Sequence, residues 1–176
     1  MKTVRLVAAI LFHIARIWAI VIFIIAGYAI GAVVIHLIAP TATSPMRVLE
    51  DQTFRIYFPF TRKVFLLGDY TSSYLVTNLV MIVFYGVFLW LLSAVFQAFR
   101  QQKIFTRRGV IRLSRFYIIN LIMPLLFLIL LLVFRTELFD MIRIGVLHLV
   151  IGVFAFFMAA IFKQGLLLQE EQDLTF

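Results

Sequence analysis

Four long apolar runs, separated by segments that hold almost all the charged residues, dominate the hydropathy pattern of the chain. The runs cover about residues 17–39, 75–99, 116–134 and 144–163. An α-helix rises about 1.5 Å per residue and needs about 20 apolar residues to cross a bilayer, which these runs supply. The pattern predicts an all-α membrane protein, a bundle of four transmembrane helices that forms a single integral membrane domain over residues 1–176.

The first run follows three basic residues, an arrangement that a secretory signal peptide would also show. The apolar core of a signal is usually about 7 to 15 residues long, and this run is clearly longer. We therefore expect a retained first span. In the third run Pro124 cannot donate a backbone hydrogen bond, so we expect a kink there.

A different periodicity marks the outer loop between the first two runs, residues 40–74. In "TFRIYFPF", which begins at Thr53, apolar residues alternate with other types, and this period of two predicts a short β-strand. "RKVFLLGDY" would be its partner in a hairpin-like loop, and Pro59 should restrict the first strand to a sheet edge. We consider two roles for the loop, an extracytoplasmic sensor or ligand cap and an amphipathic cover over the helix ends.

The composition strengthens the membrane interpretation. Hydrophobic residues make up 64% of the chain, and the mean hydropathy is +1.10. A soluble protein of this length could not enclose so many apolar side chains, so the lipid bilayer must be the main partner of the surface.

The distribution of charge predicts the orientation. The net charge is +8, and ten of the sixteen Lys and Arg residues lie in the N-terminal segment, the second loop and the tail. The second loop, residues 100–115, has six of them and no acidic residue. The positive-inside rule therefore places both termini in the cytoplasm, and the same rule explains the basic composition without a nucleic acid partner.

Small residues mark the helix faces that can pack closely. In the first run we expect packing at Ala15, Ala19, Gly27 and Gly31, and in the fourth at Gly145, Gly152 and Ala159. These stripes would face each other or a second copy of the chain, so a homo-oligomer stays open.

The sequence offers little that could carry chemistry. His36 and His148 are expected at comparable depth, where they could hold a metal ion or sense protons, but two ligands are too few and hydrogen bonding within the bundle is the simpler role. No known catalytic, nucleotide-binding or cofactor motif is present. We expect no enzyme activity, no catalytic residues, no cofactor and no metal.

The predicted cytoplasmic face combines the basic loop with an acidic tail, residues 164–176. Thr106 is a suitable N-cap for a helix that begins at Arg107 and continues into the third span. The tail, "GLLLQEEQDLTF", would continue the fourth helix and present its carboxylates beside the arginines, where exposed ion pairs worth at most about 1 kcal/mol could act as a displaceable latch.

Two cytoplasmic motifs, "KIFT" at residues 103–106 and the closing "FKQGLLLQEEQDLTF", resemble those of a family of small four-span bacterial membrane proteins, domain-of-unknown-function family 2975. The chain departs from the family after "IFT", where it has Arg107, Arg108 and Gly109 in place of an expected Asn or acidic residue. The resemblance implies a bacterial inner (plasma) membrane protein, often encoded beside a short helix-turn-helix repressor-like protein.

Our first hypothesis is therefore a non-enzymatic membrane protein that binds or tethers a cytosolic helix-turn-helix transcription regulator. The alternatives are a small transporter or transporter subunit, and an envelope sensor that uses the outer loop. The candidate partner-binding residues are Phe105, Thr106, Arg107, Arg108, Arg112, Arg115, Gln169, Glu170, Glu171, Asp173, Leu174 and Thr175.

Overall fold

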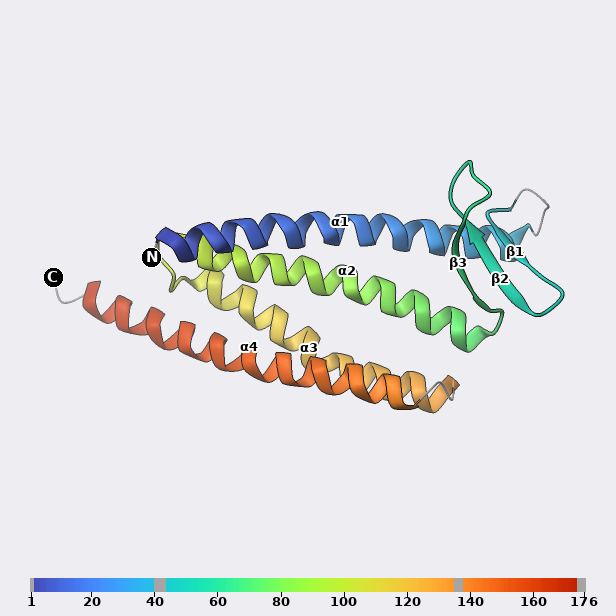
Figure 1. Ribbon diagram of the computed structural model, residues 1–176. Helices are drawn as coiled ribbons and strands as arrows, with labels where there is room; N and C mark the ends of the chain where they lie inside the picture. Colours follow the sequence, from blue (N-terminus) through green and yellow to red (C-terminus); the bar gives the residue numbers. More distant parts are fainter. Residues whose placement is uncertain (1, 40–43, 135–137, 174–176) are drawn as a thin grey trace. The chain divides into compact units, whose positions relative to one another are not determined.

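The computed structural model describes residues 2–39, 44–134 and 138–173, without the side chains of residues 138–140 and 173. In chain order the elements are α1 (Lys2–Ile38), β1 (Met46–Val48), β2 (Thr53–Tyr57), β3 (Val64–Asp69), α2 (Ser72–Arg100), α3 (Arg107–Phe134) and α4 (Leu138–Asp173) (Figure 1). The described residues thus form four helices and a small sheet between α1 and α2, which confirms the predicted fold class.

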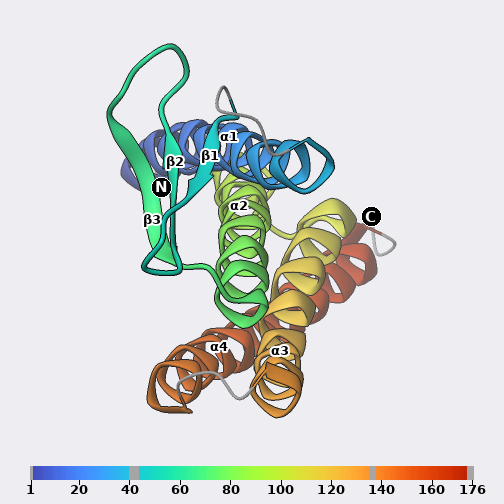
Figure 2. The same cartoon turned by 90° about the vertical axis from the view of Figure 1, so that its right-hand side faces the viewer.

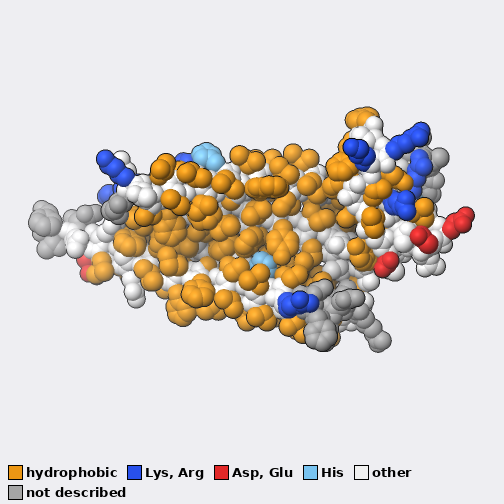
Figure 3. Space-filling model, viewed as in Figure 1, with side chains coloured by type: hydrophobic (Ala, Val, Ile, Leu, Met, Phe, Trp, Pro, Cys, Tyr) orange, Lys and Arg blue, Asp and Glu red, His pale blue; other side chains and the backbone are white. Residues whose placement is uncertain are grey.

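All four helices are long and apolar enough to cross a membrane. Hydrophobic side chains cover most of the visible helix surface, and charged side chains gather toward the ends (Figure 3). Helix α1 begins about fifteen residues before the predicted span, because the segment ahead of residue 17 has no Gly or Pro that would end a helix. The helices are consistent with a multi-pass membrane protein whose apolar side chains contact lipid.

The chain divides into two compact units, and α1 and α2 each contribute to both. Unit 1 comprises Met1–Ile20 and Gly86–Phe176, and unit 2 comprises Val21–Tyr85.

In unit 1, α3 and α4 lie side by side (Figures 1 and 2). Gly152 permits this approach, because a Cβ atom there would lie 2.8 Å from Cδ2 and 3.2 Å from the backbone N of Leu121. A Cβ atom on Gly145 would meet Pro124 at 3.7 Å, an ordinary contact, and α3 runs through Pro124 as one helix. The core of this unit is a cluster of buried apolar side chains: Val95, Ala98, Leu113, Phe116, Ala155, Ala159 and Phe162.

In unit 2, three antiparallel strands form a sheet in the order β1-β2-β3. Phe54 and Ile56 of β2 have no exposed surface, and with Met46 and Ala32 they form the core of the unit. The hairpin prediction for β2 and β3 is confirmed. The predicted edge position of β2 is wrong, because β1 pairs with its other side and β2 ends at Tyr57, before Pro59 could interrupt the pairing.

The buried face of α1 also differs from the predicted stripe. Ala15 and Ala19 are buried, but the face continues through Ala26, whereas Gly27 is exposed and a Cβ atom on Gly27 or Gly31 would have nothing within 4 Å. The reason is helical geometry, since each residue turns the helix by about 100°. Ala26 comes seven residues after Ala19 and so lies on almost the same face, whereas Gly27 comes eight residues after it and lies about 80° away.

Candidate functional site

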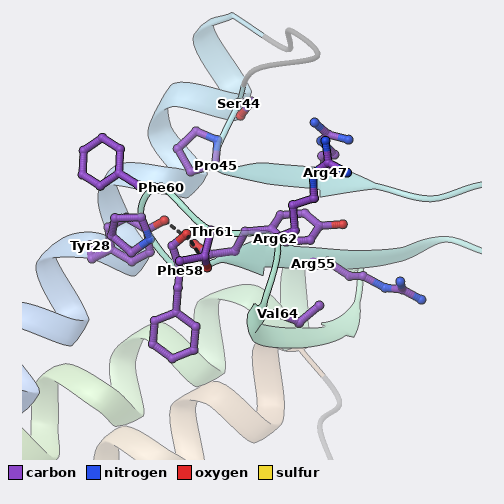
Figure 4. Close-up of a pocket in the computed structure, with 12 residues that line it drawn as sticks. Tyr28, Ser44, Pro45, Arg47, Arg55, Phe58, Phe60, Thr61, Arg62 and Val64 are labelled. Atoms are coloured by element: carbon purple, nitrogen blue, oxygen red, sulfur yellow. Dashed lines mark hydrogen bonds between the residues drawn. The ribbon is translucent and has the colours of Figure 1, made fainter.

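A cavity of about 900 Å³ lies in unit 2, at the edge of the small sheet (Figure 4). Tyr28 reaches it from α1, and the other lining residues come from the strands, from the segment before β1 and from the turn between β2 and β3. We call this cavity the arginine–aromatic cup. Its lining consists of Tyr28, Ser44, Pro45, Arg47, Arg55, Tyr57, Phe58, Pro59, Phe60, Thr61, Arg62 and Val64.

Two arginines of the cup lie directly opposite each other in the sheet. Arg47 of β1 is paired in register with Arg55 of β2, and both side chains are exposed (Figure 4). Opposed like charges destabilise an antiparallel pair, and an anion bound between them would relieve that repulsion. Arg62 adds a third guanidinium group to a lining that contains no Asp or Glu.

The aromatic side of the cup is held by hydrogen bonds. The Tyr28 hydroxyl donates to the carbonyl oxygen of Tyr57, which ties α1 to the end of β2. The turn that follows is closed by the Phe58 N–H, which donates to the Lys63 carbonyl oxygen at 2.9 Å. The guanidinium of Arg47 lies 5.7 Å from the centre of the Tyr57 ring, within the range of a cation–π contact.

Phe60 occupies an unusual backbone conformation at the tip of this turn. Its φ is 59°, a left-handed value that costs a bulky residue about 1–3 kcal/mol, and its side chain is fully exposed. Strained backbone and an exposed aromatic ring recur at ligand sites, which supports a binding role for the cup.

Asp51 lies in the turn before β2, and Arg55 affects its pKa. Hydrogen bonds from the Thr53 hydroxyl at 2.6 Å and the Thr53 N–H at 3.1 Å lower the pKa of Asp51, and Arg55 adds a smaller effect in the same direction. Asp51 does not line the cup, so the lining keeps its positive charge.

Those predicted partner-binding residues that the structure describes lie at the basic end of unit 1, which contains the start of α1, residues 101–106, the start of α3 and the end of α4. The Thr106 hydroxyl accepts a hydrogen bond from the Gly109 N–H at 3.1 Å, which confirms the predicted N-cap. The Phe105 ring packs edge-on against Phe162 of α4. It also lies against Gly165, because a Cβ atom on Gly165 would be only 2.6 Å from the Phe105 ring. Phe105 and Thr106 are thus packed or capping residues.

The charged candidates at this end differ in exposure. Arg107, Arg108 and Arg115 are exposed, whereas Arg112 is half-buried. Helix α4 continues beyond Gly165, as predicted, and presents the exposed residues Glu170 and Glu171. Leu166 is half-buried, whereas Leu167 and Leu168 are 50% and 60% exposed. Gln169 is half-buried, the side chain of Asp173 is not described, and Leu174 and Thr175 lie outside the described residues.

The two histidine candidates have different surroundings. His148 Nδ1 lies 2.8 Å from Asn120 Oδ1, and the Asn120 amide donates to the Phe116 carbonyl oxygen, so the amide oxygen faces the ring and His148 is the donor. The His36 ring packs edge-on against Tyr70 in unit 2. Among the described residues, no group of three His, Cys, Asp or Glu side chains is arranged as a metal site.

Sequence reasoning identified the aromatic outer loop but not the cup. The missing signal was β1, because its three residues "MRV" are too short to show a strand period. Without β1, the pairing of Arg47 with Arg55 could not be foreseen.

The comparison with protein families places the chain. The family described as a protein of unknown function, DUF2975, matches residues 42–176, and the chain belongs to this family. No curated protein and no solved structure matches the chain significantly.

Proposed function

We propose that this member of the DUF2975 family is a non-enzymatic receptor of the bacterial inner membrane, which binds an anionic ligand with an apolar or aromatic part in the arginine–aromatic cup. The single observation that carries the proposal is the cup itself, a cavity of about 900 Å³ that has three arginines, four aromatic rings and, among the described lining residues, no Asp or Glu. Its volume falls in the range of small-molecule sites.

The chemistry of the lining selects the ligand class. Guanidinium groups match carboxylates, sulfonates and phosphates in charge and geometry, and the rings of Tyr57, Phe58 and Phe60 offer apolar contact beside them. With both termini in the cytoplasm, the cup would face the outside, and the protein would act as an envelope sensor.

Naphthalene-2-sulfonate, an aromatic anion, is a direct probe of the cup. In ligand-observed NMR with the full chain in nanodiscs, we expect saturable binding that empty nanodiscs do not show. Arg55→Gln and Arg62→Gln should each weaken binding about tenfold, the effect of losing one charged hydrogen-bond partner. Neutral 2-naphthalenemethanol should bind more weakly than the sulfonate.

Lys63→Gln is the matched control, since Lys63 is an exposed cation beside Arg62 that does not line the cup. It removes the same charge and should leave the affinity within about twofold, because an exposed charge that makes no contact with the ligand contributes little. Equal weakening by Lys63→Gln, or none by the two arginine variants, would contradict the proposal.

A second candidate function, the tethering of a cytosolic helix-turn-helix regulator, is favoured by the end of α4. Helix α4 continues for eight residues beyond Gly165, to Asp173, and at about 1.5 Å each these residues extend it by about 12 Å. This end of the helix offers a partner apolar contacts at the exposed Leu167 and Leu168. It offers acidic contacts at the exposed Glu170 and Glu171.

Co-purification tests whether the end of α4 binds a regulator. A full chain and a chain truncated after Leu168 should differ in recovery of a cytosolic helix-turn-helix regulator, and a Gln172→Ala chain is the control for a change at the tail. Equal recovery with and without the tail would remove its role.

For the transporter alternative, the described polar side chains of the helices favour structural roles, because Asn78 and Ser93 donate to carbonyl groups of their own helix.

A further inference from the structure

A second cluster of arginines lies within unit 1, where α1, α2 and α3 approach one another. The guanidinium carbon of Arg16 in α1 lies over the Trp90 ring of α2, 3.6 Å from its centre. Arg16 and Arg112 of α3 repel each other electrostatically, and Arg108 repels Arg112. The cations Arg16, Arg108 and Arg112 therefore belong to one cluster.

Two guanidinium donors of this cluster lack a partner. Arg16 Nε and Arg112 Nη1 are buried and have no hydrogen-bond partner among the described residues. Arg112 acts on Arg16, and Arg108 acts on Arg112, so each of these two cations is opposed by another cation. A buried guanidinium donor without a partner costs free energy, which an anion that accepts its hydrogen bond would offset.

The two arginine side chains are not fully enclosed by the protein. Arg16 and Arg112 are both half-buried, so part of each side chain stays accessible. Stacking on Trp90 uses the face of the Arg16 guanidinium, whereas its N–H donors lie in the plane of the group. Arg16 can therefore stack on the ring and hydrogen-bond an oxyanion at the same time.

The depth of the cluster agrees with a lipid headgroup. A bilayer core of about 30 Å corresponds to about 20 helical residues. Counted from the ends of three helices at Ile38, Ser72 and Phe134, that length reaches Trp18, Leu92 and Ser114. Arg16, Trp90 and Arg112 each lie within two residues of these positions, at the expected boundary between hydrocarbon and headgroups.

We propose that Arg16, Arg112 and Arg108, with Trp90, form a binding site for a phosphate group, carried either by an anionic phospholipid or by a soluble phosphate compound. Arginine forks bind phosphate oxygens in pairs, and basic pockets between membrane helices recognise anionic headgroups. The site is separate from the arginine–aromatic cup, which belongs to unit 2.

Native mass spectrometry of the full chain in a neutral detergent tests the proposal with three probes: phosphatidylglycerol, phosphatidylcholine and inorganic phosphate. We expect phosphatidylglycerol to bind at least about tenfold more tightly than phosphatidylcholine. Arg16→Gln and Arg112→Gln should each weaken it about tenfold or more, as expected for loss of a charged hydrogen-bond donor. Arg107→Gln, the same loss of charge at an exposed position of α3, should change the affinity by less than about threefold.

Arg16→Lys separates a site defect from misfolding. It keeps the charge but not the planar fork, so phosphatidylglycerol affinity should be intermediate while helix content and elution match the wild type. Competition by inorganic phosphate, with the same dependence on Arg16 and Arg112 and no preference for phosphatidylglycerol, would assign the site to soluble phosphate compounds. Unchanged binding of every probe in the Arg16 and Arg112 variants, or equal loss in Arg107→Gln, would overturn the proposal.

Discussion

At the scale of single residues, the contact between α3 and α4 depends on Gly152. Gly152→Ala would place a methyl group 3.2 Å from the backbone N of Leu121 and closer still to its side chain, so the helices must separate or shift. We expect a loss of about 1–3 kcal/mol of stability, the usual cost of overpacking. Thermal or denaturant unfolding of the full chain in detergent would measure the change.

Gly27→Ala provides the matched control, because a Cβ atom at Gly27 has nothing within 4 Å. The same substitution should there be neutral or stabilising, since Ala favours a helix over Gly by about 1 kcal/mol. A Gly152→Ala chain as stable as the wild type would show that α3 and α4 do not meet at Leu121.

The hydrogen bond between His148 and Asn120 is the second residue-level test. Asn120 has no exposed surface and His148 only 1%, so Asn120→Leu would leave the His148 Nδ1–H without its acceptor. We expect destabilisation of about 1–3 kcal/mol, the cost of an unsatisfied buried donor. A double-mutant cycle with His148→Phe should give a coupling of about 0.5–2 kcal/mol, and a coupling of zero would show that the two side chains do not interact.

At the scale of elements, the turn between β1 and β2 makes a prediction about pH. The hydrogen bonds from Thr53 lower the pKa of Asp51, so the carboxylate stabilises the turn above its ordinary pKa, and this contribution is lost as the pH falls through the lowered value. A ¹³C NMR titration of the Asp51 carboxyl should give a pKa below that of an exposed Asp.

Thr53→Val removes the hydroxyl donor and should raise the pKa of Asp51 toward its ordinary value while keeping a β-branched residue in the strand. Thr61→Val, a like change in the next turn, is the control and should leave the Asp51 titration unchanged. An Asp51 pKa that is the same in the Thr53 variant and the wild type would contradict the assigned hydrogen bonds.

The elements also show what the sequence could predict. The four helices follow from apolar runs long enough to cross a bilayer, and the β2–β3 hairpin follows from the alternation around Phe54 and Ile56. The arginine–aromatic cup and the proposed phosphate site at Arg16, Trp90 and Arg112 could not be predicted, because they depend on which residues of separate elements meet. Arg47 meets Arg55 only through strand register, and Arg16 meets Trp90 only through helix packing.

At the scale of the whole molecule, the two proposed sites differ in where their arginines come from. The cup draws Arg47, Arg55 and Arg62 from the segment between α1 and α2, whereas the phosphate site draws its cations from α1 and α3. A chain with four spans should have both termini on the same side of the membrane. The sheet follows the first span, so it should lie on the opposite side. The ligand of the cup and the partner of α4 would then occupy different compartments.

The absence of cysteine from the sequence makes this topology directly testable. Thr61→Cys and Gln172→Cys each introduce one thiol at an exposed position, in the β2–β3 turn and near the end of α4. In intact spheroplasts, a membrane-impermeant maleimide should label the Thr61 variant and spare the Gln172 variant, because the positive-inside rule predicts that the second loop and both termini lie inside. Both variants should label fully after lysis, which controls for thiol reactivity. Labelling of the Gln172 variant in intact spheroplasts would reverse the orientation and place the cup, with its ligand, in the cytoplasm.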